Sequence, residues 1–262
     1  MMEPIIEMKQ VKKAFGQKEV LKGVDFKVYP GQIIGYIGPN GAGKSTTVKI
    51  IMGLLSQDSG EIHIFGELLQ GNQEEYKKRI GYVPENADLY ETLTAAEYLV
   101  FMGQLYGLEE AVIIKKAYQM MTALGIEASF HARLETFSKG MRQKVLIISS
   151  LLHDPDVLFW DEPLNGLDAN SVLVIKEILV GLKERGKTIF YSSHIMDTVE
   201  KLSDRILLLN DGEVVADGSF KEIAQEADNT LENLFNQLTG FNEQGELADA
   251  FLGAMKGEFA YE

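Results

Sequence analysis

The sequence of 262 residues contains no cysteine, which excludes a disulfide scaffold, a cysteine-based zinc site and a cysteine nucleophile. Basic residues are also fewer than acidic residues. The chain has 25 lysines and arginines against 39 aspartates and glutamates, so its formal net charge is −14. Nucleic acid is not expected as a partner, because phosphate neutralisation requires Lys and Arg. The length is that of one large domain or two small ones.

Long apolar runs are missing as well. The apolar run at residues 145–152 already contains two serines, and no stretch approaches the roughly 18 consecutive apolar residues of a membrane span. The N-terminus lacks the basic start and apolar core of a signal peptide. We therefore expect an intracellular chain that does not itself cross a membrane.

Several segments have the patterns of β-strands. Val24, Phe26 and Val28 alternate with polar residues, which predicts a strand with one solvent-facing side. Residues 32–37 form a compact apolar run, typical of a strand buried on both faces. The Asp211-Gly212 pair predicts a type I′ hairpin turn, because both residues tolerate positive φ angles. Further strands are expected around Ile62 and Ile64 and at residues 157–160, 188–192 and 206–209.

Helical periodicity begins near Asn86. Thr94 and Glu97 fit a capping box at the start of one helix. Further helices are expected over residues 109–124, from Ser138 to about His153, and over residues 171–185. The pattern predicts a mixed α/β fold that is interrupted by an all-helical segment at about residues 87–152.

The negative charge is concentrated at the C-terminal end. Residues 222–262 hold nine acidic residues and one lysine, so this segment supplies −8 of the −14 and leaves −6 on residues 1–221. Charge runs of this kind usually form a solvated face of a helix. We interpret residues 219–262 as an acidic, mainly helical extension of unassigned role.

Residues 38–46, Gly-Pro-Asn-Gly-Ala-Gly-Lys-Ser-Thr, match the phosphate-loop pattern G-x-x-x-x-G-K-[ST]. The glycines allow backbone N–H groups to turn inward and form a concave anion site. The helix that follows directs its positive end at the same phosphates. Lys44 can reach the β- and γ-phosphates, and the Ser45 hydroxyl can ligate Mg²⁺. A phosphate-binding site is therefore predicted here.

An acidic pair follows the apolar run at residues 157–160. A strand that ends in a carboxylate places that group at the carboxyl edge of the sheet, where α/β sheets bind ligands. We interpret Asp161 as a Mg²⁺ ligand and Glu162 as the general base that activates water. An apolar strand that runs into Asp-Glu is ordinary by itself, and the phosphate loop upstream favours the functional interpretation.

These segments together resemble the ATPase subunit of an ATP-binding-cassette (ABC) transporter, of the bacterial exporter type, over about residues 4–218. The motifs occur in the family's order: the phosphate loop, a glutamine-loop segment at residues 81–85, a signature segment at residues 137–143, the acidic pair, the D-loop at residues 166–168 and the switch histidine His194. The resemblance implies a P-loop NTPase core with an antiparallel β subdomain and an inserted α-helical subdomain. Residues 1–218 then form the ATPase domain.

The resemblance also implies roles for individual residues. It assigns catalysis to Glu162, His194 and Lys44. It assigns the binding of Mg²⁺ to Ser45, Glu85 and Asp161. The nucleotide contacts are Phe15, which stacks on adenine, with Asn40, Gly41, Gly43, Lys44, Ser45, Thr46, Ser138 and Gly140. The sequence departs from the family at Glu85, where Gln is commonest, and at Lys139 and Met141 of the signature segment.

Ser138 has two interpretations. It is the N-cap of a predicted helix, and in the family it also closes over the γ-phosphate held by a second subunit. The latter implies a head-to-tail dimer, homomeric or heteromeric, with two ATP molecules between the subunits. His194 is likewise either structural or a γ-phosphate contact. His63, His131 and His153 are interpreted as structural.

The leading hypothesis is an ATP-hydrolysing subunit with ATP and Mg²⁺ as cofactors, bound peripherally at the cytoplasmic side of the cell membrane. It drives a separate integral membrane permease, with export as the expected direction. Leu89, Tyr90 and Leu93 are the expected exposed contact surface. The alternatives are a soluble ABC ATPase acting on nucleic acid or ribosomes, and a scaffold that binds ATP without hydrolysis. The chain lacks the basic stripe of the first, and Lys44, Asp161 and Glu162 together argue against the second.

Overall fold

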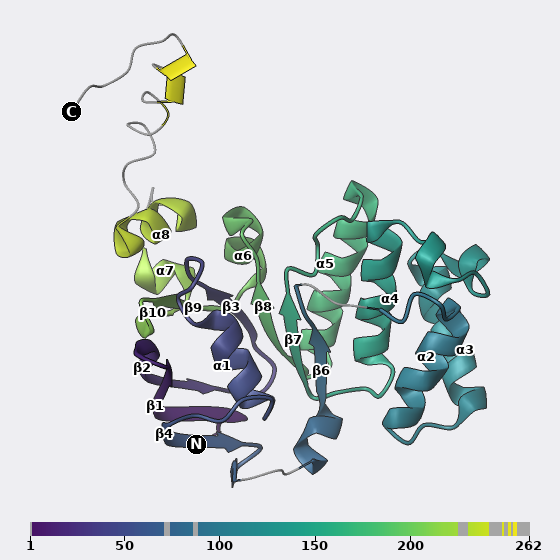
Figure 1. Ribbon diagram of the computed structural model, residues 1–262, viewed down its shortest axis with the longest axis horizontal. Coiled ribbons are helices and arrows are strands. Elements are labelled where there is room, and N and C mark those ends of the chain that lie inside the picture. Colours follow the sequence, from purple (N-terminus) through teal and green to yellow (C-terminus); the bar gives the residue numbers. More distant parts are fainter. Residues whose placement is uncertain are drawn as a thin grey trace.

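A computed structural model describes residues 2–70, 74–85, 89–224, 230–240, 248, 251–252 and 254–255. Two sheets and a set of helices make up this part of the chain (Figure 1). The smaller sheet is antiparallel, with the strand order β2-β1-β4-β5. Its strands are β1 (Ile6–Phe15), β2 (Lys18–Val28), β4 (Ser59–Ile64) and β5 (Glu67–Leu68).

The larger sheet has the order β10-β9-β3-β8-β7-β6. Five of its strands are parallel, and β10 runs antiparallel to β9. Asp211 and Gly212 join β9 to β10 with φ angles of 45° and 80°, which confirms the predicted turn with positive φ at both positions. The strands are β3 (Ile33–Ile37), β6 (Ile80–Val83), β7 (Val157–Asp161), β8 (Thr188–Ser192), β9 (Arg205–Asn210) and β10 (Glu213–Gly218).

The central strands β3, β7 and β8 are buried on both faces, as the apolar run at residues 32–37 predicts for β3. Because successive side chains point to opposite faces, each strand contributes to two cores. Leu158 and Ile189 pack with the helices of one core. Phe159 and Phe190 stack in the other core, 4.7 Å apart, together with the antiparallel sheet. This places the ends of β3, β7 and β8 side by side.

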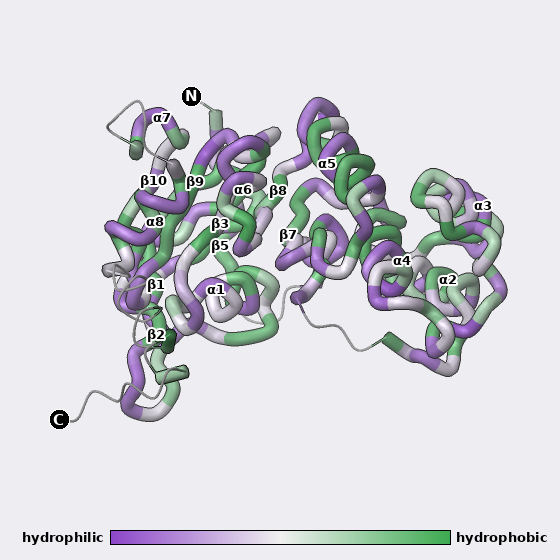
Figure 2. Tube along the Cα trace, turned by 90° about the horizontal axis from the view of Figure 1, so that it is seen from above, coloured by the Kyte–Doolittle hydropathy of each residue, from purple (hydrophilic) through white to green (hydrophobic). Residues whose placement is uncertain are grey.

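The helices flank the larger sheet. Helices α2, α3 and α4 lie on the side of the molecule away from β1 and β2 (Figure 2). The helices are α1 (Lys44–Ile51), α2 (Ala95–Leu105), α3 (Glu110–Ala123), α4 (Lys139–Leu151), α5 (Ala169–Glu184), α6 (Met196–Leu202), α7 (Phe220–Ile223) and α8 (Leu231–Thr239). Short 3₁₀ turns occupy Glu75–Arg79, Glu127–Ser129 and Leu134–Thr136.

The predicted capping box is present at the start of α2. The Thr94 hydroxyl accepts from the N–H of Glu97, and the Glu97 carboxylate accepts from the N–H of Thr94. Helix α5 begins two residues before the predicted start, because Asp168 caps it by accepting from the N–H of Ser171. The predicted helical segment begins at residues 87 and 88, which lie outside the described residues.

Leu89 was expected to be exposed, and this expectation is wrong. Its side chain is only 9% exposed, because it packs into the helical core. Tyr90 is 59% exposed, and its ring meets Phe101 of α2 edge-on at 5.7 Å. Leu93 is partly buried against the same core. Of the three residues, Tyr90 is therefore the one that is largely exposed, next to the exposed Phe101 of α2.

The described part of residues 219–262 begins with α7 and α8. Helix α8 is anchored to the body by buried Leu231 and Leu234, and the backbone N–H of Leu231 donates to Glu200 of α6. Glu222 forms a capping box with Ser219, and Glu232 is exposed, as the solvated-face interpretation predicts. The other seven acidic residues of 222–262 lie outside the described residues.

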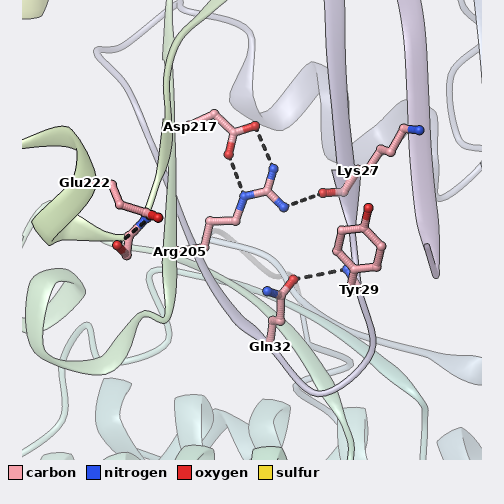
Figure 3. Close-up of polar contacts among 7 residues, drawn as sticks. Lys27, Tyr29, Gln32, Arg205, Asp217 and Glu222 are labelled. Carbon is pink, nitrogen blue, oxygen red and sulfur yellow. Dashed lines mark hydrogen bonds and ion pairs between the residues drawn. The ribbon is translucent and has the colours of Figure 1, made fainter. Parts of the chain in front are cut away.

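Arg205 joins the two sheets (Figure 3). Its guanidinium donates to both carboxylate oxygens of Asp217, at 2.5 and 2.6 Å, and to the backbone carbonyl of Lys27 at 2.6 Å. The planar guanidinium matches a carboxylate in this bidentate geometry. Strands β9 and β10 are thereby tied to the end of β2.

None of the described helices combines the length and apolar character needed to span a membrane.

Candidate active site

The loop of residues 38–43 connects the carboxyl end of β3 to α1. Gly41 and Gly43 have φ angles of 83° and 108°, which L side chains rarely adopt. At Gly38 a Cβ atom would lie 2.1 Å from the carbonyl oxygen of Leu209, so only glycine fits. Helix α1 starts directly after this loop. Its first N–H groups and dipole make this end of the helix a natural anion site.

A cavity of about 230 Å³ opens at this loop. It brings together residues from the phosphate loop, the end of β6, the end of β7 and the segment after β8. The lining residues are Lys18, Val20, Ile37, Gly38, Asn40, Gly41, Gly43, Lys44, Ser45, Thr46, Glu85, Asp161, Glu162, Ser193 and His194. Nearly all the predicted phosphate, metal and catalytic residues therefore share one cavity.

Lys44 is the cation of the cavity. Its ammonium group donates to the carbonyl oxygens of Gly38 and, at 3.2 Å, of Pro39. Burial lowers the pKa of Lys44, and the carboxylates of Asp161, Glu162 and Glu85 oppose this effect. These carboxylates favour the charged ammonium that a polyphosphate needs.

The acidic pair lies where β7 ends. Asp161 accepts a hydrogen bond from the hydroxyl of Ser192, the last residue of the neighbouring strand β8. Glu162 is only 5% exposed and has a φ angle of 50°, unusual for a residue other than glycine. Its N–H donates to the carbonyl of Ser192 at 3.0 Å. The turn directs the carboxylate into the cavity.

Glu162 has the electrostatics of a general base. Burial raises its pKa, and the nearby carboxylates of Asp161 and Glu85 raise it further, whereas His194 lowers it. His194 Nε2 lies 3.6 Å from Oε1 of Glu162. The Ser193 hydroxyl donates to Oε2 at 3.4 Å. A carboxylate with a raised pKa is a stronger proton acceptor than an ordinary glutamate.

The oxygen atoms of the cavity fit Mg²⁺. Asp161, Glu85 and the Ser45 hydroxyl supply hard oxygen ligands, which this ion prefers. In the described part of the chain, no three His, Cys, Asp or Glu side chains cluster as a complete metal site. A bound Mg²⁺ would therefore share its ligands with phosphate oxygens and water, as is usual for this ion.

Three predicted contacts lie elsewhere. Phe15 is 51% exposed at the end of β1, where it pairs across the strands with Lys18, and the Lys13 ammonium lies 5.6 Å from its ring centre. Ser138 caps α4 by accepting from the N–H of Met141 at 3.2 Å, which confirms the capping interpretation. Gly140 lies in the first turn of α4. Neither Ser138 nor Gly140 lines the cavity of its own chain.

Sequence reasoning did not assign Lys18, Val20, Ile37 or Ser193 to the cavity that they line. Lys18 and Val20 follow the turn after Phe15, and Ser193 precedes His194. Lys18 and Val20 belong to β2, a strand of the smaller sheet. No motif near them in the sequence indicates that they line the cavity. Ser192 and Ser193 are polar residues at the end of an apolar strand. This is the same pattern that indicated a site at Asp161 and Glu162.

The arrangement suits the hydrolysis of a nucleoside triphosphate. The loop and Lys44 can hold the phosphates, hard oxygen atoms can hold the metal, and Glu162 can accept a proton from a water molecule. Cavity residues come from the ends of parallel strands that lie side by side in the order β3-β8-β7-β6. Ligands of open α/β sheets bind at such carboxyl ends.

Comparisons with known proteins agree with this chemistry. Residues 21–165 match the family described as ABC transporter. The chain is 40% identical over 215 residues to the linearmycin resistance ATP-binding protein LnrL of Bacillus subtilis (strain 168), a match that covers 82% of this chain and 69% of the relative.

Two solved structures are also similar. An ATP-binding subunit of an ABC transporter has a TM-score of 0.84 and 34% identity, over 90% of this chain and 99% of that chain. A dimeric ATP-binding cassette in a post-hydrolysis state, bound to ADP and Pi, has a TM-score of 0.75 and 25% identity, over 82% of this chain and 98% of that chain.

Proposed function

The chain belongs to the ABC transporter family as an ATP-hydrolysing subunit that dimerises, and we propose that its dimer drives a separate integral membrane permease, with export as the direction. The observation that supports hydrolysis most directly is the shared cavity of Lys44, Asp161 and Glu162. The relatives do not favour the alternative of a soluble ABC ATPase that acts on nucleic acid or ribosomes.

The proposed mechanism assigns one task to each cavity residue. The N–H groups of the phosphate loop and Lys44 hold the β- and γ-phosphates, with Asn40, Gly41, Gly43 and Thr46 forming the cradle. When bound, Mg²⁺ neutralises charge that develops on the phosphate oxygens, and Ser45, Asp161 and Glu85 would hold it. Glu162 accepts the proton of the attacking water. His194 contacts the γ-phosphate and keeps this water aligned.

The remaining predicted contacts belong to the dimer. We propose that Ser138 and Gly140 of one subunit close over the γ-phosphate bound to Lys44 of the other. Their absence from the cavity of their own chain supports this role, as does their place at the positive end of α4. Phe15, exposed at the end of β1, would stack on adenine. Two ATP molecules then hold two subunits together, and hydrolysis separates them.

The proposed permease surface is the apolar part of α2 with the segment before it. Tyr90, Phe101 and Leu105 are large, exposed and apolar. The two aromatic rings pack against each other, which fixes part of this surface in one geometry. Docking here would place the protein peripherally on the cytoplasmic side of the membrane. Glu85 lines the cavity and comes two residues after the end of β6.

Glu162→Gln tests the hydrolytic mechanism. The variant keeps the shape of the side chain but cannot accept a proton. We expect ATP binding to persist, an ATP-dependent dimer to accumulate in size-exclusion chromatography, and turnover to fall at least a hundredfold, at the low end of what a general base contributes. Glu177→Gln, an exposed position on α5, is the matched control. Unchanged turnover in E162Q would refute the assignment of Glu162 as the base.

The permease surface has its own test. Affinity purification of the chain from native membranes is expected to recover an integral membrane protein. The double variant Tyr90→Ala and Phe101→Ala is expected to lose this protein and to keep its basal ATPase activity. Leu173→Ala removes an equally exposed apolar side chain from α5 and serves as the control. Recovery of the membrane protein by the double variant would exclude this surface.

A further inference from the structure

Gln143 is a buried amide on the inner face of α4, and it contacts the loop that carries the catalytic carboxylate. Its side chain is 8% exposed. Its amide nitrogen Nε2 donates to the backbone carbonyl of Pro163 at 3.2 Å. Buried amides need such partners, because an unpaired buried donor costs about 1–3 kcal/mol. This hydrogen bond fixes the distance between α4 and Pro163.

Pro163 directly follows Glu162, whose backbone adopts the left-handed conformation. That conformation is unfavourable for a residue with a Cβ atom, and it persists because the surroundings hold it. The N–H of Glu162 is bound to Ser192, and its carbonyl accepts from the N–H of Asn165 at 3.1 Å. The ring of Pro163 fixes its φ angle. Holding the Pro163 carbonyl therefore restrains the direction in which Glu162 leaves the backbone.

The same helix contacts the rest of this loop, residues 162–168. In the first turn, a Cβ atom on Gly140 would lie 2.6 Å from the carbonyl oxygen of Gly166, so the two backbones are in close contact. One turn later Gln143 holds Pro163, and the Lys144 ammonium lies 3.8 Å from Oδ2 of Asp168. A displacement of the helix is therefore passed to the loop at several points.

From these contacts we infer that Gln143 is a positioning residue, which couples Glu162 of its own subunit to the nucleotide that Ser138 contacts across the dimer. Ser138 and Gln143 lie on one rigid helix, five residues apart. Engagement of Ser138 would thus set the position of the Pro163 carbonyl and, through it, of Glu162. This inference rests on the proposed role of Ser138 and on Glu162 as the base.

The test uses two variants of the full chain. Gln143→Met has a similar length and cannot donate a hydrogen bond. Gln143→Glu has the same shape and presents an acceptor to the Pro163 carbonyl. Ser150→Ala is the control, because Ser150 is also buried on α4 and accepts from the indole N–H of Trp160 at 3.1 Å. The turnover number, the KM for ATP and the melting temperature are measured for each.

We expect kcat to fall about ten- to a hundredfold in both Gln143 variants, as a displaced catalytic group does, with KM within about twofold of the wild type. In the double variant with Ser138→Ala, the losses in kcat should be smaller than the product of the single losses.

Three results would overturn the inference: a wild-type kcat in Q143M and Q143E, effects equal to those of S150A, or losses that multiply with those of S138A. Glu162→Gln separates this failure from that of the proposed function. If E162Q is inactive while both Gln143 variants are normal, only the role of Gln143 is refuted. If E162Q retains turnover, the assignment of the base itself is refuted.

Discussion

His194 Nε2 lies 3.6 Å from Oε1 of Glu162, and the two side chains come from segments that follow neighbouring parallel strands. The histidine is largely exposed, whereas the glutamate is buried. Burial and the neighbouring carboxylates raise the pKa of Glu162, and His194 is the group that lowers it. The histidine thus favours the ionised form of the proposed base.

This relationship predicts the pH dependence of hydrolysis. The base works only when it is deprotonated, and its pKa is raised, so the acidic limb of the kcat profile should lie above the value of 4.5 for an ordinary glutamate. In His194→Ala the limb should move to still higher pH, because the imidazole that lowers the pKa is gone, whereas the backbone N–H at this position remains. Turnover at neutral pH should fall about ten- to a hundredfold.

His131→Ala is the control for this experiment, because His131 lies on the exposed surface of the helical segment, away from the cavity. Initial rates of phosphate release between pH 5 and 9 provide the profile. A limb that stays in place, or moves to lower pH, in H194A would show that His194 does not act on Glu162.

Magnesium dependence provides a second prediction. In Asp161→Asn one negative charge leaves the metal position, so Mg²⁺ should bind more weakly. We expect the Mg²⁺ concentration at half-maximal rate to rise about tenfold or more, and a chelator to abolish hydrolysis by the wild type. Asp197→Asn, an exposed residue paired with Lys201, is the control. Identical Mg²⁺ titrations of D161N and the wild type would remove Asp161 from the metal site.

The capping box of α2 predicts a change in stability. Thr94→Ala removes the hydroxyl that accepts from the N–H of Glu97, and the loss of such a cap costs about 1 kcal/mol. For a chain of this size the melting temperature should fall by roughly 2–4 °C. Thr94→Ser keeps the hydroxyl and should melt close to the wild type. Equal melting temperatures for T94A and T94S would show that the cap does not contribute.

The sequence predicts well those parts of the fold that depend on neighbouring residues. The capping box at Thr94 and Glu97, the turn at Asp211 and Gly212, and the buried strand β3 are present as expected. Each is specified within a few residues by hydrogen-bonding side chains, positive φ angles or an unbroken apolar run. The phosphate loop is likewise specified by residues that are close together in the sequence.

Features that depend on distant segments were harder to anticipate. Strand β6 has only four residues and includes Gly81, where a Cβ atom would lie 2.3 Å from the carbonyl of Ser150 on α4. The glycine at position 81 is therefore required by close packing against α4 and not by a turn. Lys18 and Ser193 reach the cavity because β2 begins and β8 ends beside the phosphate loop. The burial of Leu89 likewise follows from helix packing that no local pattern reveals.

The bidentate pair of Arg205 and Asp217 leads to the last prediction (Figure 3). Lysine carries the same charge but cannot form two parallel hydrogen bonds to a carboxylate and a third to the Lys27 carbonyl. Arg205→Lys should therefore lower the free energy of unfolding by about 1–2 kcal/mol, measured by urea denaturation. Arg185→Lys, at the exposed C-terminal end of α5, should change it by less than about 0.5 kcal/mol. Because the pair ties β9 and β10 to β2 and lies away from the cavity, R205K should keep its KM for ATP. Equal denaturation midpoints for R205K and R185K would mean that packing alone holds the two sheets together.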